Sequence, residues 1–162
     1  MIKKIIILTI LLPCLAIAGD LPKADFVLVK KHEKRLYLIK NEKPFKIYRV
    51  AFGANSKGPK TKEGDERTPE GTYMLDFKNS DSDFYKSIHI SYPNDQDIKR
   101  AKKMGADPGG DIMIHGQKNG AKNFERIHRY VNWTDGCIAV TNTEMDEIWI
   151  SVDVGTPITI EP

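Results

Sequence analysis

Two short segments of the 162-residue chain hold the residue types that could carry covalent chemistry. In residues 111–116, an apolar run ends in His115, which is followed by Gly116. In residues 133–140, a polar turn leads to Cys137 at the start of another apolar run. A thiolate is a nucleophile, and a neighbouring imidazole can take the thiol proton and return it to a leaving amine. The pair therefore predicts acyl transfer with Cys137 as nucleophile and His115 as base.

Gly136 predicts a further part of such a site. Glycine directly before a nucleophile allows a tight backbone turn, so that consecutive amide N–H groups can point toward one oxyanion. The candidate oxyanion amides are those of Asp135, Gly136 and Cys137. A complete site would then need only the backbone and two side chains.

Other histidines are alternative bases. His89 lies in a strand-like run on the side opposite Ile88 and Ile90, whereas His128 lies in a charged helical stretch. His32 lies in a polar turn, where solvation is the expectation. The position of His115 at the end of an apolar run, directly before a glycine, favours this histidine over the others.

Zinc chemistry is a second alternative. His115, His128 and a carboxylate such as Asp111 could supply ligands, but the sequence has no short His-x-x-x-His or Cys-x-x-Cys spacing. We therefore expect neither a metal nor another cofactor.

The N-terminus predicts export. Lys3 and Lys4 precede an apolar run, and the Ala-Ile-Ala triplet at residues 16–18 fits a cleavage site. The apolar run contains Pro13 and is shorter than the roughly 20 residues of a membrane-spanning helix. Proline beside Cys14 argues against a lipid-attachment site.

We therefore expect residues 1–18 to be a cleaved signal peptide and residues 19–162 to form one catalytic domain in the periplasm or cell envelope. Cleavage would leave Cys137 as the single cysteine, although exported chains normally use cysteines in pairs. Loss of Lys3 and Lys4 changes 25 basic and 22 acidic residues to 23 and 22, a net charge of +1. This balance gives no general electrostatic reason to bind nucleic acid or an anionic membrane.

Hydrophobic patterning predicts a mainly β fold with three short helices. Runs rich in β-branched and aromatic residues, separated by turn signals, predict strands. These runs are residues 26–29, 35–39, 45–50, 72–77, 88–92, 112–115, 137–140 and 157–160. The predicted helices are residues 95–104, 121–130 and 141–152, the last with a Thr141/Glu144 capping box.

Around the two reactive segments the chain resembles the L,D-transpeptidases with a YkuD-type catalytic domain. The resemblance rests on Ile114-His115-Gly116, on Thr-Asp-Gly-Cys-Ile at residues 134–138, and on Thr-Pro-Glu-Gly at residues 68–71. It extends over residues 26–160 and is greatest to the YafK-like branch.

The resemblance implies a β-sandwich-like domain in which the Gly116 carbonyl orients His115 and the amides of Asp135 and Gly136 form an oxyanion hole. Family members acylate the cysteine with the third residue of a peptidoglycan stem tetrapeptide and release the terminal D-alanine. The acyl group then passes to an amine or to water. The implied partners are stem peptides and, in one version of the reaction, a wall-attached lipoprotein.

Two positions depart from the usual family pattern. Many members carry histidine where this chain has Asp135, and a basic or amide residue where it has Ala139. The Asp135 charge should oppose deprotonation of Cys137. These departures leave open a non-catalytic peptidoglycan-binding module with the same fold. The candidate substrate-binding residues are Tyr92, Thr134, Arg126, Arg129 and Asn142.

Overall fold

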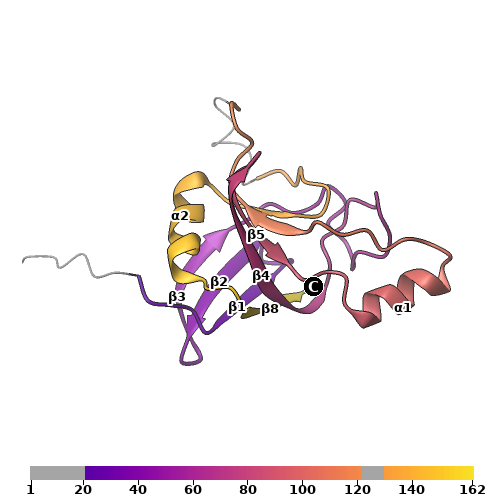
Figure 1. Cartoon of the computed structure of the whole chain (residues 1–162), viewed down its shortest axis with the longest axis horizontal. Coiled ribbons are helices and arrows are strands. Elements are labelled where there is room, and N and C mark those ends of the chain that lie inside the picture. Colours follow the sequence, from indigo (N-terminus) through magenta and orange to yellow (C-terminus); the bar gives the residue numbers. More distant parts are fainter. Residues whose placement is uncertain (1–20, 122–129) are drawn as a thin grey trace, which may run out of the picture.

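The computed structural model describes residues 21–121 and 130–162 (Figure 1). The predicted signal peptide and nearly all of the predicted helix at residues 121–130 lie outside these ranges. The two other predicted helices and all of the predicted strands lie within them.

Within the described residues, eight strands form one hydrogen-bonded sheet in the order β3-β2-β1-β8-β4-β5-β6-β7. The β1–β8 and β6–β7 pairs are parallel, and the other neighbouring pairs are antiparallel. All the predicted strands are confirmed, and β4 is longer than predicted. The strands are β1 (Phe26–Lys30), β2 (Arg35–Lys40), β3 (Lys43–Arg49), β4 (Gly71–Ser82), β5 (Tyr85–Ile90), β6 (Met113–His115), β7 (Ile138–Ala139) and β8 (Thr156–Glu161).

The sheet curls until its two edges approach each other. The segment that follows β3 forms isolated bridges from Ala51 to Ala139 and from Gly53 to Thr134. Leu36, Ile114 and Ile158 are fully buried inside the curl, although they come from strands far apart in the sheet order. The curl thus gives one core between facing strands and confirms the predicted mainly β, sandwich-like class.

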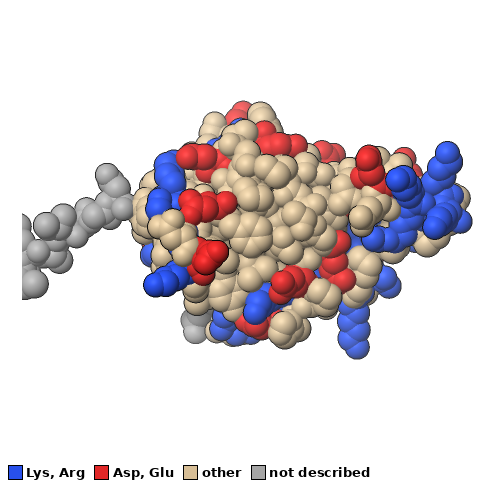
Figure 2. All heavy atoms as spheres, turned by 90° about the horizontal axis from the view of Figure 1, so that it is seen from below, with Lys and Arg blue, Asp and Glu red and all other residues tan. Residues whose placement is uncertain are grey.

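Two helices lie outside the sheet among the described residues (Figure 1). Helix α2 (Asn142–Ser151) begins at the predicted Thr141/Glu144 capping box, and its Met145 and Ile148 are fully buried. Helix α1 (Asp95–Lys103) projects from the domain, and basic side chains gather over it in Figure 2. No helix of the described ranges is long and apolar enough to cross a membrane.

A buried lysine fixes the long loop between β3 and β4. The Lys31 ammonium donates to the Gly58 carbonyl at 2.7 Å and to the Thr68 carbonyl at 3.2 Å, and pairs with Glu70 at 2.7 Å. Lys31 is only 7% exposed, so these partners are needed to compensate its charge. The bonds hold both halves of the loop against the sheet.

Asp65 organises the middle of the same loop. Its carboxylate pairs with Lys60 at 3.0 Å and accepts the backbone N–H groups of Thr61, Lys62 and Arg67. Burial alone would raise the pKa of Asp65, but these hydrogen bonds outweigh it and lower the pKa to about 2. The loop is therefore built around one ionised carboxylate.

Candidate active site

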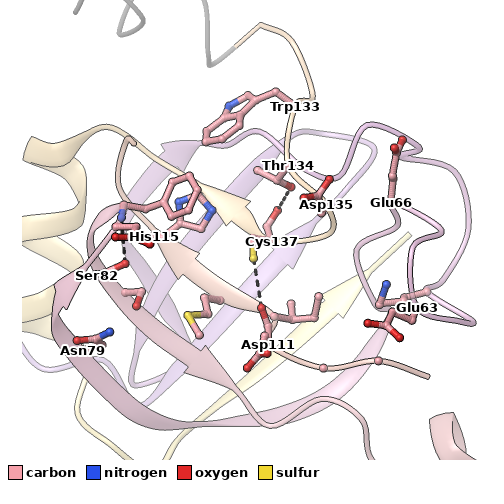
Figure 3. A pocket seen from close by; sticks show the side chains of 18 of the residues that line it. Glu63, Glu66, Asn79, Ser82, Asp111, His115, Trp133, Thr134, Asp135 and Cys137 are labelled. Atoms are coloured by element: carbon pink, nitrogen blue, oxygen red, sulfur yellow. Dashed lines mark hydrogen bonds between the residues drawn. The ribbon is translucent and has the colours of Figure 1, made fainter. Parts of the chain in front are cut away.

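The parallel pairing of β6 with β7 brings His115 and Cys137 to one face of the sheet. His115 ends β6 and lies opposite Ala139, and Cys137 lies two residues before Ala139. Because side chains alternate along a strand, Cys137 and Ala139 share a face. Both His115 and Cys137 line one cleft (Figure 3). The volume of this cleft is about 770 Å³.

The His115 imidazole is held in one orientation. Its Nδ1 lies 2.6 Å from the Gly116 carbonyl oxygen, which is the contact that the resemblance implied. The ring centroids of Phe84 and Trp133 lie 4.6 and 5.7 Å from the imidazole centroid. Since a carbonyl only accepts, Nδ1 must carry the proton, and this tautomer has the lone pair on Nε2, as a base requires.

The Cys137 thiol is held differently. It donates a weak hydrogen bond to the Asp111 carbonyl, with 3.5 Å between Sγ and the oxygen (Figure 3). Burial raises the pKa of Cys137, and the negative charges of Asp135 and Asp111 raise it further. The resting group is therefore a neutral thiol, and the direction of the Asp135 effect agrees with the prediction.

The turn before Cys137 requires glycine at position 136. Gly136 has a φ of +132°, and a Cβ there would lie 2.6 Å from the Arg67 carbonyl oxygen. A Cβ on Gly53 would lie 2.1 Å from the Glu66 carbonyl oxygen of the same loop and 3.1 Å from the Gly136 Cα of the cysteine turn. The β3–β4 loop thus packs backbone against backbone on the cysteine turn.

Thr134 stabilises this turn from within. Its hydroxyl donates to the Cys137 carbonyl at 2.7 Å and accepts the Gly136 N–H at 3.3 Å. Thr134 lines the cleft, and its hydroxyl is engaged inside the turn. An oxyanion would have to compete with this long hydrogen bond for the Gly136 amide.

Two other predicted substrate contacts are placed elsewhere. Tyr92 is 3% exposed, its hydroxyl donates to the Pro108 carbonyl, and it is absent from the cleft lining. The Asn142 side chain accepts the Gln117 N–H at 2.8 Å and so holds the segment after His115. Neither residue lines the cleft. Arg126, Arg129 and His128 lie outside the described residues.

Two other histidines, the alternative base His89 and the turn residue His32, are engaged away from the cleft. His89 Nδ1 lies 2.7 Å from an Asp76 carboxylate oxygen, and His32 Nδ1 lies 2.7 Å from the Pro162 carbonyl oxygen. Neither of them lines the cleft. Among the described residues, His115 is the one histidine in the cleft lining. The same residues contain no group of three His, Cys, Asp or Glu side chains that could hold a metal ion.

The cleft also contains residues that the sequence patterns do not predict. Phe84 and Ser87 reach the cleft through β4–β5 and β5–β6 pairing, for which the sequence carries no local signal. Acidic side chains are also more numerous than predicted. Six carboxylates line the cleft: Glu63, Glu66, Asp81, Asp83, Asp111 and Asp135.

The chain is similar to known proteins over nearly all of the described domain. Residues 24–160 match the YkuD family, described as the L,D-transpeptidase catalytic domain. YafK of Escherichia coli K12 is 26% identical over 169 residues, covering 90% of this chain and 61% of YafK. YqjB of Bacillus subtilis is 29% identical over 143 residues, covering 88% of this chain and 74% of YqjB. Both relatives are assigned as L,D-transpeptidases, and the chain spans about three fifths of YafK.

Solved structures agree with this similarity. The helical cell shape determining protein Pgp2 of Campylobacter jejuni has 29% identity and a TM-score of 0.64, covering 84% of this chain and 46% of Pgp2. An L,D-transpeptidase of Mycobacterium smegmatis has 16% identity and a TM-score of 0.54, covering 85% of this chain and 58% of that protein. The second likeness concerns the fold alone.

Proposed function

Because the chain belongs to the family of YkuD-type L,D-transpeptidase catalytic domains, we propose that it is an exported cysteine enzyme acting on peptidoglycan stem peptides. The observation that carries the proposal is the shared cleft of His115 and Cys137, with the imidazole Nδ1 bonded to the Gly116 carbonyl. This arrangement supplies a nucleophile and a base in a fixed tautomer. Relatives named as L,D-transpeptidases support the substrate class.

The proposed reaction has two halves. In the first, His115 Nε2 takes the thiol proton, Cys137 Sγ bonds to a stem-peptide carbonyl carbon, and the C–N bond to the next residue breaks. His115 returns the proton to the leaving amine. In the second, an amine or water attacks the thioester while His115 takes its proton and gives it to the departing thiolate. Backbone amides of residues 135–137 would stabilise the oxyanion of each tetrahedral intermediate.

The acyl acceptor defines the biological outcome. An amine acceptor gives a cross-link or attaches a wall protein such as a lipoprotein, and water gives trimming or release of an attached protein. The proposed compartment is the periplasm or cell envelope, where peptidoglycan is accessible. All of these outcomes share the acyl-enzyme on Cys137.

A non-catalytic peptidoglycan-binding module is the second candidate function. The observation that favours it is the Cys137 thiol, whose pKa is raised by burial and by Asp135 instead of lowered. Such a module would bind stem peptides without changing them.

Product analysis separates the two functions. We expect the purified protein to change the masses of a muropeptide pool, and we expect Cys137→Ala to leave the pool unchanged. The pool must contain tetrapeptides, cross-linked stems and protein-linked stems. Identical products from the two proteins across these substrates would contradict the enzymatic proposal, and retained binding of muropeptides would then favour the module.

A further inference from the structure

Ser87 is a buried hydroxyl group in the cleft that the proposed reaction leaves without a role. It lies on β5, is 1% exposed and lines the cleft. Its Oγ has no hydrogen-bond partner among the described residues. A buried hydroxyl without a partner destabilises the folded protein, and in a cleft wall a bound ligand can complete the missing hydrogen bond.

The register of three neighbouring strands places Ser87 relative to the reacting groups. Ser87 on β5 pairs with His115 on β6, which in turn pairs with Ala139 on β7. These three side chains form a row on one face, and Cys137 lies at the β7 side of it. His115 therefore lies between Ser87 and the nucleophile's strand.

This order indicates which reacting group lies on each side of the His115 imidazole. His115 has to pass a proton between the thiol and the nitrogen that leaves or enters, so that nitrogen must be next to the ring. The thiol is on the β7 side. The remainder of the amine-bearing group therefore extends toward β5, where Ser87 lies.

The same side of the cleft is acidic. Asp81 and Asp83, from the end of β4 and the turn before β5, line it and form no ion pair with another described residue. Lys60 is the one lysine or arginine in the described lining, and it is paired with Asp65. Unpaired carboxylates give this side a negative potential, which attracts cations and repels other carboxylates.

We propose that Ser87, Asp81 and Asp83 form the subsite for the amine-side group, and that this subsite prefers a neutral or positively charged group over one with a free carboxylate. The inference rests on the proposed function. When Cys137 is acylated, the Sγ–C bond forms, the C–N bond breaks and the thiol proton goes to the leaving nitrogen through His115. The Ser87 hydroxyl binds a polar atom of the leaving residue, and the two carboxylates set its charge preference.

Three donors that differ only at their fourth residue test the charge preference. Stem tetrapeptides ending in D-alanine, D-alaninamide and D-lysinamide carry a negative, a neutral and a positive group there. For the unmodified protein we expect kcat/KM for release of the fourth residue to rise in that order, by roughly fivefold from the first to the second at low salt. Asp81→Asn/Asp83→Asn should reduce this preference, as should 0.5 M salt, because exposed charges are screened.

A matched pair of serines tests the hydroxyl. Ser151, the last residue of α2, is also fully buried with an unpartnered Oγ, but it does not line the cleft. We expect Ser87→Ala and Ser151→Ala both to keep or raise the melting temperature, because each removes an unsatisfied hydroxyl. Only Ser87→Ala should raise KM, by about threefold to tenfold, the effect of one lost hydrogen bond.

The outcomes separate this inference from the function on which it rests. Folded protein that releases the fourth residue from none of the donors would overturn both. Release with unchanged KM in Ser87→Ala, or a preference for the D-alanine donor, would overturn the subsite alone. Glu42→Gln/Glu161→Gln removes two carboxylates that do not line the cleft and should leave the donor preference unchanged.

Discussion

The contacts of His115 and Cys137 in the cleft fix the two side chains to different degrees. His115 is buried, bonded to the Gly116 carbonyl and bordered by the Phe84 and Trp133 rings. Cys137 has one long hydrogen bond from its thiol, and burial and two carboxylates keep it protonated. In the proposed mechanism, the difference teaches that the base is arranged in advance, whereas the nucleophile depends on that base to become reactive.

Removal of the proposed base, His115, should have the largest effect on the reaction rate. We expect His115→Gln to lower the rate of D-alanine release about 10²- to 10⁴-fold, because general base catalysis typically contributes that much. His89→Gln is the matched control, since His89 is a half-buried strand histidine bonded to a carboxylate outside the cleft. Equal rates in the two variants would mean that His115 is not the base.

The glycine turn that carries Cys137 comes next in expected effect. Gly136→Ala forces a Cβ to within 2.6 Å of the Arg67 carbonyl oxygen at a φ of +132°. We expect the free energy of unfolding to fall by about 2–4 kcal/mol, since strain and a clash add. Gly64 also has a positive φ but has open space around it. Gly64→Ala should therefore lower the free energy of unfolding by only about 1 kcal/mol. Urea denaturation measures both, and similar losses would contradict the close approach.

The loop that packs on this turn depends on Asp65. We expect Asp65→Asn to lower the free energy of unfolding by about 2 kcal/mol at pH 7, as a pKa lowered by nearly two units implies. A lowered folded-state pKa adds stability above the unfolded pKa near 4, and that stability is lost as the pH falls toward 2. Denaturation should therefore show a smaller difference in the free energy of unfolding between the unmodified protein and Asp65→Asn at pH 3 than at pH 7. A pH-independent difference would show that ionisation of Asp65 does not matter.

The smallest expected effect concerns the charge beside the nucleophile. Asp135→Asn should lower the pKa of Cys137, because it removes one of the charges that raise it. The pH profile of alkylation of Cys137 by iodoacetamide should then move to lower pH. Glu42→Gln, which removes a charge outside the cleft, should leave the profile in place, and an unmoved profile in Asp135→Asn would contradict the electrostatic explanation.

Local patterns were sufficient to predict the described strands and helices, and they also pointed to His115 and Cys137, which line one cleft. Alternating apolar runs predicted the strands, and Thr141 with Glu144 predicted the start of α2, because both signals lie within a few residues of the structure they specify. His115 and Cys137 are recognisable in the sequence because an imidazole and a thiol are reactive side chains and each has a glycine beside it. Their common face follows from β6–β7 register, which depends on the whole sheet.

The walls of the cleft could not be predicted in the same way. Ser87 reaches His115 only through β5–β6 pairing, and Asp65 acts by closing a loop around itself. Tyr92, a candidate substrate-binding residue, has a buried ring, and its hydroxyl donates to the Pro108 carbonyl. Such contacts join segments whose spacing in the sequence carries no signal.

The acyl-enzyme is the central species of the proposed reaction, and intact-protein mass spectrometry would detect it directly. After brief incubation with a stem tetrapeptide, we predict a mass increase equal to the peptide minus its terminal D-alanine, located on the Cys137 peptide after digestion. Cys137→Ala should show no increase, and His115→Gln should show it only after much longer incubation. Release of D-alanine by the unmodified protein without any adduct, at a rate that Cys137→Ala matches, would contradict a covalent mechanism on Cys137.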